Sequence, residues 1–323
     1  MTPLLELDHL TTRYVSARGA RVVEAVSDIS FRLEAGETLG IVGESGSGKT
    51  TLALSIMRLL PPAARIASGA VRFEGEDLVT KSDREMRRLR GKRIAMILQD
   101  PMASLNPLFT VGDQVAESLR VHEGASRRTA WSRARELLTA VKIPAPEARV
   151  REYPHQLSGG MRQRIVGAIA ISCEPRLLIA DEPTTSLDVT IQAQYLNLLR
   201  ELQREHGLAL IFITHNLGIV ARMCDRAAVM YAGRLVEIGP VRRIFDSPAH
   251  PYTRALLESI PRLADSRARL TAIDGQPPDL AALPTGCAFH PRCPKVEDRC
   301  RREVPTDVTV AEDHRARCWL AAR

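Results

Sequence analysis

Apolar residues in the first part of the chain fall into short runs separated by longer segments with helical spacing. Residues 4–14 and 25–33 partly alternate between apolar and polar positions, which is typical of half-buried strands. Short, continuously apolar runs, which indicate buried strands, follow at 39–42, 177–180 and 208–214.

The segments between these strands are predicted to be helices. Residues 113–142 have a helical pattern, and Pro144 and Pro146 follow as helix breakers. A second helix is predicted at 159–172. A third is predicted from 189 to 202, where apolar residues recur at helical spacing at Ile191, Tyr195, Leu198, Leu199 and Leu202. Strands that alternate with helices predict an α/β fold with a mostly parallel sheet.

Length and composition are those of a globular protein. The 323 residues suffice for one large core with an appendage or for two domains. The longest apolar stretch, 165–171, is far shorter than the roughly 20 residues of a membrane-spanning helix. The start, Met1-Thr2-Pro3, has no basic region followed by an apolar one, so we predict no signal peptide and a cytoplasmic protein.

The net charge of +7 could indicate nucleic acid, anionic lipid or a phosphate ligand as a partner. The densest basic stretch, residues 81–93, has no interleaved aromatic side chains that would stack on bases. We interpret this stretch as a solvated helix face and predict no nucleic-acid partner.

Gly43 to Thr50 form the pattern GxxxxGKT between a buried strand and the apolar run 52–60. Glycines allow backbone N–H groups to converge on an anion, and the following helix N-terminus favours negative charge. Lys49 would neutralise phosphate charge and the Thr50 hydroxyl would bind Mg²⁺. The candidate ATP-binding residues are Gly43, Glu44, Ser45, Gly46, Ser47, Gly48, Lys49, Thr50 and Thr51.

A second acidic site follows the strand at 177–180, which ends in Asp181 and Glu182. Asp181 is a candidate Mg²⁺ ligand, and Glu182 could orient or deprotonate the attacking water. By itself the pair would equally suit a helix N-cap.

Between these two sites, residues 157–163 read LSGGMRQ, which resembles the LSGGQ signature loop of ABC transporter ATPases, with Met161 in place of the commoner Gln. The resemblance covers about residues 4–240. It implies a P-loop NTPase (RecA-like) core with an N-terminal antiparallel β subdomain, and a helical signature subdomain at about 100–165. The resemblance also implies that Ser158, Gly159 and Gly160 contact the γ-phosphate of ATP bound by the opposite subunit.

The resemblance implies roles for further residues. Tyr14 matches the aromatic residue that stacks on adenine, although it would also suit an ordinary strand position. Gln99 matches the Q-loop, which senses Mg²⁺ and faces the membrane partner, and 186–188, with Asp188, match the D-loop. His215 matches the switch histidine at the γ-phosphate. The implied catalytic residues are Glu182, His215 and Gln99, and the implied Mg²⁺ ligands are Thr50, Gln99 and Asp181.

Three segments, 99–107, 250–257 and 286–294, resemble those of bacterial dipeptide and oligopeptide importers; nickel, sugar and opine importers share them. This resemblance implies an ATPase at the cytoplasmic membrane face, a second ATPase subunit, two permease subunits and a solute-binding protein. The alternative is a soluble ABC ATPase of translation or DNA repair, but the chain has one motif set and no heptad run.

Composition changes after about residue 240, where prolines become frequent, and we predict a C-terminal extension at 241–323 that forms a small Cys-rich lobe. Cys173 and Cys224 lie in apolar surroundings, as core thiols do. The spacing C-x5-C-x6-C-x17-C lacks the close pairs of structural zinc sites and favours a [4Fe–4S] cluster, with zinc or no metal as alternatives. Its candidate ligands are Cys287, Cys293, Cys300 and Cys318.

Overall fold

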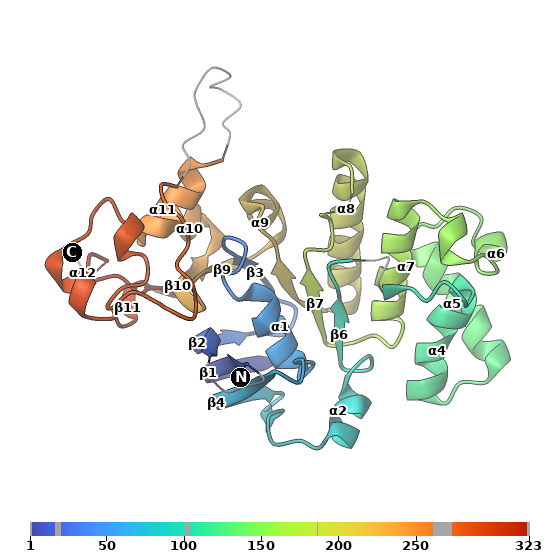
Figure 1. Ribbon diagram of the computed structural model, residues 1–323. Coiled ribbons are helices and arrows are strands. Elements are labelled where there is room, and N and C mark those ends of the chain that lie inside the picture. The colour runs from blue at the N-terminus through green and yellow to red at the C-terminus, as the bar shows by residue number, and fades with distance from the viewer. Residues whose placement is uncertain (1, 17–20, 101–103, 186, 261–272, 322–323) are drawn as a thin grey trace. The chain divides into compact units, whose positions relative to one another are not determined.

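The computed structural model describes residues 2–16, 21–100, 104–185, 187–260 and 273–321. Its elements are labelled in Figure 1. The chain divides into two compact units. The first unit comprises Met1–Leu33, Thr38–Val79 and Phe212–Arg323, and the second comprises Glu34–Glu37 and Thr80–Ile211.

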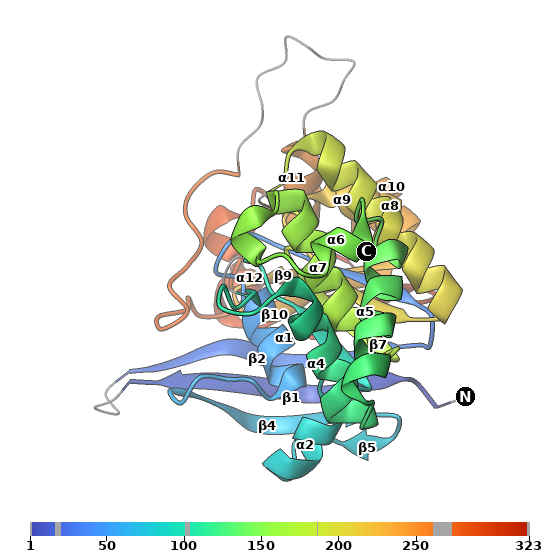
Figure 2. The same ribbon diagram turned by 90° about the vertical axis from the view of Figure 1, so that its right-hand side faces the viewer.

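The first unit contains an antiparallel sheet with the strand order β2-β1-β4-β5. Figure 2 shows its three long strands side by side. The strands predicted at 4–14 and 25–33 are present, because their alternating pattern buries one face. The bounds are β1 Leu5–Val15, β2 Val22–Leu33, β4 Ala64–Phe73 and β5 Glu76–Asp77.

A second series of strands in the first unit has the order β11-β12-β10-β9-β3. β3 is parallel to β9, whereas the pairs β9/β10, β10/β12 and β11/β12 are antiparallel. The bounds are β3 Thr38–Val42, β9 Arg226–Tyr231, β10 Arg234–Pro240, β11 Val308–Ala311 and β12 His314–Ala316.

The pairing of β12 with β10 corrects the prediction of a separate Cys-rich lobe. Glu237 and Ile238 of β10 pair with Ala316 and Arg315 of β12, so the C-terminal segment extends the sheet of the first unit. The pairing occurs because it satisfies backbone groups that an open strand edge would leave without partners. The helices of this unit are α1 Lys49–Met57, α9 Leu217–Met223, α10 Val241–Asp246, α11 Pro251–Glu258 and α12 Asp298–Arg302, with a 3-10 turn η2 at His290–Arg292.

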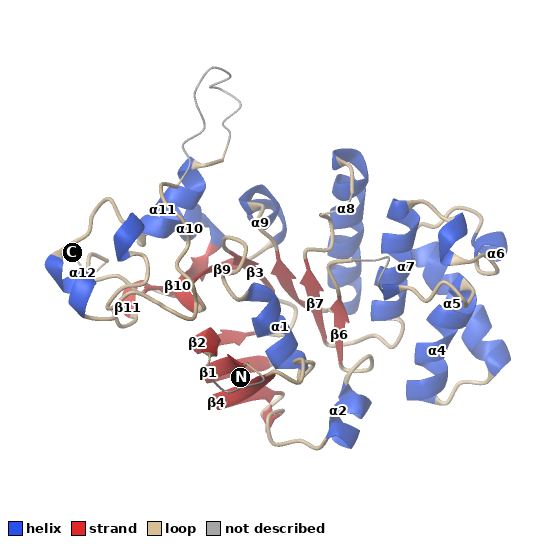
Figure 3. Ribbon diagram, in the orientation of Figure 1, coloured by secondary structure: helices blue, strands red, loops and turns tan. Residues whose placement is uncertain are grey.

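In the second unit, the strand order is β8-β7-β6, and β6 and β7 are parallel. β6 spans Ile94–Ile97, β7 spans Leu177–Asp181 and β8 spans Ala209–Ile213, of which 209–211 belong to this unit. Figure 3 shows only helices and loops between residues 111 and 171. The helices of the unit are α2 Asp83–Leu89, α4 Val111–Glu123, α5 Arg127–Ala140, α6 Pro146–Arg149, α7 Gly159–Ile171 and α8 Val189–His206, with a 3-10 turn η1 at Pro154–Gln156.

The single helix predicted at 113–142 is in fact two helices, α4 and α5. Gly124 ends α4 in the left-handed conformation with φ 68°, and the Ser126 side chain caps α5 by accepting the Thr129 N–H. A left-handed glycine and a new N-cap interrupt the helical hydrogen bonds even where the apolar spacing continues. In α2 the buried residue is Met86 while Arg84, Arg87 and Arg88 are exposed, as expected for a solvated basic face.

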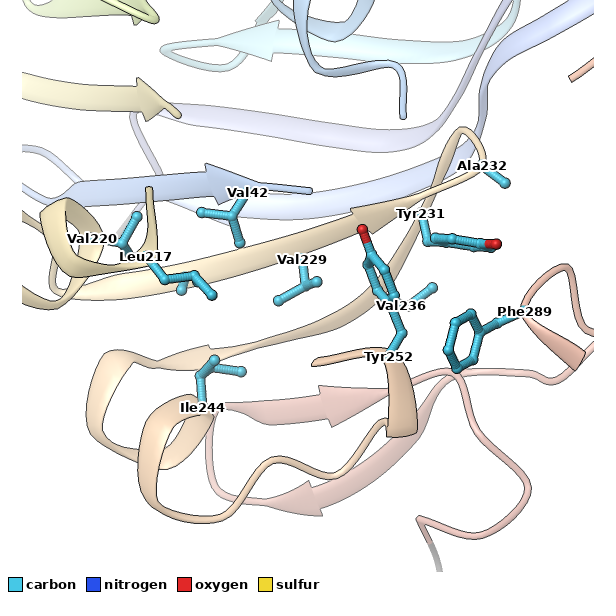
Figure 4. Packing of buried hydrophobic residues seen from close by; sticks show 11 residues of the cluster. Val42, Leu217, Val220, Val229, Tyr231, Ala232, Val236, Ile244, Tyr252 and Phe289 are labelled. Atoms are coloured by element: carbon cyan, nitrogen blue, oxygen red, sulfur yellow. The ribbon is translucent and has the colours of Figure 1, made fainter. Parts of the chain in front are cut away.

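A buried cluster in the first unit joins β3, the strand that precedes the candidate phosphate loop at 43–50, to the C-terminal segment at 241–321. Val42 of β3 belongs to the same cluster as Tyr231 of β9, Tyr252 of α11 and Phe289 (Figure 4). The ring centroids of Tyr231 and Tyr252 are 4.5 Å apart, and those of Tyr252 and Phe289 are 5.3 Å apart. Three aromatic rings, from β9, α11 and the segment before η2, thus pack together where the C-terminal extension meets the rest of the first unit.

Candidate nucleotide site

The loop from Gly43 to Gly48 connects β3 to α1, and close packing explains its glycines. Gly43 and Gly48 have φ values of 154° and 102°. A Cβ atom at Gly43 would lie 2.2 Å from the Met230 carbonyl oxygen, and one at Gly48 would lie 2.2 Å from the Ala25 carbonyl oxygen. Any larger residue would displace the backbone, so the loop geometry depends on these two glycines.

Lys49 begins α1 and folds back over the loop. Its Nζ donates to the carbonyl oxygens of Gly43 at 2.8 Å and Glu44 at 2.9 Å, and the residue is 6% exposed. Thr50 follows and is exposed. A loop that combines an ammonium group with a helix N-terminus is chemically suited to bind phosphate.

Tyr14, near the end of β1, contacts the helix that follows this loop. Its hydroxyl oxygen is 3.4 Å from the Thr51 Oγ1, and the residue is partly buried. The contact brings the candidate adenine-stacking residue to the first turn of α1. Its role in stacking remains a prediction.

In the second unit, β7 ends at Asp181, which is 1% exposed. Glu182 follows with a φ of 45°, a left-handed conformation that few non-glycine residues adopt. Thr185 Oγ1 donates to the Glu182 carboxylate at 2.9 Å, and Gln99 Nε2 lies 3.5 Å from the same oxygen. Gln99 and Glu182, 83 positions apart, are therefore adjacent in space. A carboxylate oriented in this way can accept a proton from water.

The signature segment begins α7. The Ser158 side chain caps the helix by accepting the Met161 N–H at 3.4 Å. Ser158 and Gly159 are exposed, so this helix N-terminus can be reached from solvent. Gly160 has a different reason to be glycine, because a Cβ there would lie 2.7 Å from Ile191 Cγ2 of α8.

Asp188 caps α8 by accepting the Ile191 N–H at 3.0 Å. Ser186 of the predicted D-loop, and residues 101–103 of the importer-like segment, lie outside the described residues. His215 follows β8 and is exposed in the first unit. The first unit thus carries Tyr14, the phosphate loop and His215, and the second carries Gln99, Ser158, Gly159, Gly160, Asp181, Glu182 and Asp188.

Sequence reasoning missed two residues at the phosphate loop. Arg292 donates to both carboxylate oxygens of Glu44, and the Tyr252 hydroxyl accepts the Glu44 backbone N–H at 3.0 Å. Burial raises the pKa of the Tyr252 phenol. The only sequence signal for either residue was the importer-like character of the segments that contain them.

The four candidate iron–sulfur ligands line one pocket together with Phe289 and Trp319. Burial raises the pKa of the Cys287 thiol to about 11, and the neighbouring thiols add to the rise. Within the described ranges, however, no group of three or more His, Cys, Asp or Glu residues could hold a metal ion. The prediction of an assembled [4Fe–4S] or zinc site is therefore not supported. Cys173 is buried as predicted, and Cys224 is partly buried against the core cluster.

Across the part of the chain that the structure describes, no helix is both long enough and apolar enough to cross a membrane.

Two family models match this chain: "ABC transporter" at residues 26–185 and "Oligopeptide/dipeptide transporter, C-terminal region" at residues 236–300. The chain is 50% identical over 321 residues to the dipeptide transport ATP-binding protein DppD of Bacillus subtilis (strain 168), covering 99% of this chain and 95% of that protein. It is 49% identical to the oligopeptide transport ATP-binding protein OppD of Salmonella typhimurium (strain LT2), covering 94% of this chain and 90% of that protein.

Among solved structures, the chain resembles the ATP-binding cassette MJ0796 in a dimeric post-hydrolysis state bound to ADP and Pi. The TM-score is 0.66 at 27% identity, covering 74% of this chain and 99% of that one. The match confirms the expected ATPase cassette fold. Together, these similarities over nearly the whole length show that the chain belongs to the ABC transporter ATP-binding proteins, in the group with an oligopeptide/dipeptide transporter C-terminal region.

Proposed function

We propose that this chain, an ABC-type ATPase, drives the import of dipeptides or oligopeptides through separate permease subunits at the cytoplasmic face of the membrane. The observation that carries the proposal is an identity of 49–50% to peptide-transport ATP-binding proteins over 94–99% of the chain, including the C-terminal region at 236–300. The same region disfavours the alternative of a soluble ATPase of translation or DNA repair.

We assign roles at the nucleotide site from the residues themselves. The loop amides and Lys49 would hold the ATP phosphates, and Tyr14 would stack on adenine. Bound Mg²⁺, held by Thr50, Gln99 and Asp181, would supply charge neutralisation at the phosphates. These donors fit the ion, because hydroxyl, amide and carboxylate oxygens are the ligands that Mg²⁺ prefers.

Glu182 would orient the attacking water and accept its proton, helped by the hydrogen bond from Thr185. His215 would contact the γ-phosphate. The exposed N-terminus of α7, with Ser158, Gly159 and Gly160, would bind the phosphate of ATP held by a second ATPase subunit, identical or related. The D-loop residue Asp188 would lie at the same subunit contact.

We infer that the permease binds beside the helical region of the second unit. Leu108 is 80% exposed and Phe109 is 54% exposed. Pro107 and Leu108 line one pocket with residues 151–153, His155 and Gln156. Exposed apolar side chains beside a polar-rimmed pocket are typical of a protein contact.

We propose the same division of the chain as the sequence predicts. Residues 1–240 would form the ATPase domain and 241–323 its extension. An extracytoplasmic solute-binding protein would deliver the peptide to the permeases.

The test is reconstitution with the permeases and solute-binding protein of the same system. We expect the chain to co-purify with the permeases, and peptide-loaded binding protein to stimulate ATP hydrolysis in membrane vesicles. The matched control is Lys49→Ala, which should bind ATP weakly and remain unstimulated. ATP hydrolysis that is indifferent to permeases and to peptide would refute the importer assignment.

The four-cysteine centre remains a prediction from the sequence. A shared pocket for Cys287, Cys293, Cys300 and Cys318 favours it, whereas the absence of a metal-binding group among the described residues does not. Anaerobically purified protein should contain about four iron and four sulfide per chain if the cluster exists. Stoichiometric zinc would instead support the alternative metal, and metal-free protein with an ordered C-terminal segment would reject both.

A further inference from the structure

The phosphate loop is joined to the C-terminal segment by an ion pair between residues 248 positions apart. Arg292 of η2 donates to the two carboxylate oxygens of Glu44 at 2.7 Å and 3.0 Å. The Arg292 side chain is 4% exposed and that of Glu44 is 26% exposed. A two-point contact between guanidinium and carboxylate is among the stronger and more directional polar contacts in proteins.

Arg292 is itself held in place by the surrounding segment. Its Nε donates to the Asp274 carbonyl oxygen at 2.9 Å, and its guanidinium carbon lies 5.8 Å from the centre of the Tyr231 ring. The hydrogen bond with Glu44 raises the pKa of the Arg292 guanidinium above its ordinary value. The guanidinium therefore remains charged and in one orientation.

The Glu44 backbone is held by the same part of the chain. Its N–H donates to the Tyr252 hydroxyl at 3.0 Å, and Tyr252 packs against Tyr231 and Phe289 in the buried cluster shown in Figure 4. The Glu44 N–H and the Glu44 carboxylate therefore both form hydrogen bonds with residues of the C-terminal segment. The loop position depends on residues that the GxxxxGKT pattern does not contain.

Charge explains why such a contact would matter for ATP. Residues 43–50 contain one acidic side chain, Glu44, and one basic side chain, Lys49. Without a partner, the Glu44 carboxylate would offset the positive charge of Lys49 and would repel a polyphosphate bound by the loop. Charges within one partly buried loop interact strongly. With Arg292 paired to Glu44, the loop keeps a positive balance from Lys49.

We propose that Arg292 is a positioning residue of the nucleotide site, which neutralises and orients Glu44 so that normal ATP affinity requires the C-terminal segment. This inference rests on the proposed assignment of the Gly43–Thr50 loop to the ATP phosphates. A displacement of residues 290–293 would then break the contact with Glu44 and weaken ATP binding, which gives the C-terminal segment a means to regulate ATP binding.

The experiment measures ATP binding by the full-length chain and ATP hydrolysis by the assembled transporter. Arg292→Met should weaken ATP binding about ten- to a hundredfold, the effect expected for removing a charge-assisted contact. KM for ATP should rise by the same factor, and kcat should change by less than about twofold because Arg292 touches no reacting group. Arg292→Lys should recover part of the affinity.

The decisive variant combines Arg292→Met with Glu44→Gln. Removing the carboxylate should restore ATP affinity to that of Glu44→Gln alone, because no unpaired charge then remains. The control is Arg317→Met, which removes another partly buried arginine of the C-terminal extension, paired with Asp28 and Asp307, and should leave ATP affinity unchanged.

Wild-type affinity in Arg292→Met, or a defect of equal size with and without the Glu44→Gln change, would overturn the inference. Should Arg292→Met fail to fold, the comparison of Arg292→Lys in the two Glu44 backgrounds makes the same distinction. Lys49→Ala separates the two levels of argument: unchanged ATP binding in that variant would refute the loop assignment itself.

Discussion

Glu182→Gln tests the proposed chemistry most directly, because it removes one charge and little else. The amide oxygen can still accept the Thr185 hydroxyl that lies 2.9 Å from the carboxylate. The Gln99 contact, at 3.5 Å, is at the limit of hydrogen-bonding distance and contributes little. What the amide cannot do is accept a proton from the attacking water.

These contacts set the expected magnitudes. Replacing an ionised acceptor by a neutral one at Thr185 costs about 1 kcal/mol, so folding and ATP binding should be nearly unchanged. Loss of general-base assistance slows a reaction about 10²- to 10⁴-fold, which corresponds to about 2.7–5.5 kcal/mol of activation free energy. The effect on turnover should therefore exceed the effect on binding at least tenfold.

The assay compares multiple-turnover ATP hydrolysis in the assembled transporter with ATP binding measured by titration calorimetry. Thr185→Val is the matched control: it removes the orienting hydrogen bond but keeps the carboxylate, and should slow turnover at most about tenfold. Turnover by Glu182→Gln within about threefold of wild type would refute the assignment of the base. So would a larger defect in Thr185→Val than in Glu182→Gln.

Two further substitutions test other parts of the structure. Ser158→Ala should lower the free energy of unfolding by about 1 kcal/mol through loss of the α7 cap, whereas Ser158→Gly should lower it by only a few tenths of a kcal/mol. In transporters that combine a Ser158→Ala subunit with a normal one, hydrolysis should be impaired for the ATP bound by the normal subunit. A defect in the ATP bound by the Ser158→Ala subunit itself would contradict the arrangement. Glu237→Ala should lower the free energy of unfolding, measured by urea titration, by at least about 3 kcal/mol, because the buried carboxylate accepts from His314 and from the backbone N–H groups of Ala249 and His250. Glu237→Gln should recover more than half of that loss, and a loss below about 1 kcal/mol in Glu237→Ala would contradict the importance of this network.

Local patterns predicted the elements that carry the candidate nucleotide-binding residues. The apolar runs at 39–42 and 177–180 are strands β3 and β7, and the helical spacing at 189–202 belongs to α8. These predictions succeed because a buried strand or an amphipathic helix is encoded by neighbouring residues. The failure at 113–142 was also local in origin, since Gly124 and Ser126 carry the stop and start signals that the apolar spacing obscured.

The Cys-rich segment shows where local reasoning was insufficient. Cysteine spacing predicted a self-contained lobe stapled by a metal. The tertiary structure instead pairs β12 with β10 and packs Phe289 into the cluster of Tyr231 and Tyr252. Backbone pairing and apolar burial thus attach the segment to the first unit through contacts that the cysteine spacing does not indicate.

The sequence by itself determined the candidate phosphate-binding loop, because the glycines, Lys49 and the start of α1 are contiguous in one short segment. It could not determine that Arg292 would neutralise Glu44 or that Gly160 would be needed for contact with Ile191. Those contacts join segments far apart in the chain, and they exist only because sheet pairing and burial of apolar faces bring the segments together. Local composition does not encode which distant surfaces will meet, so that part of the nucleotide site was decided by the tertiary structure alone.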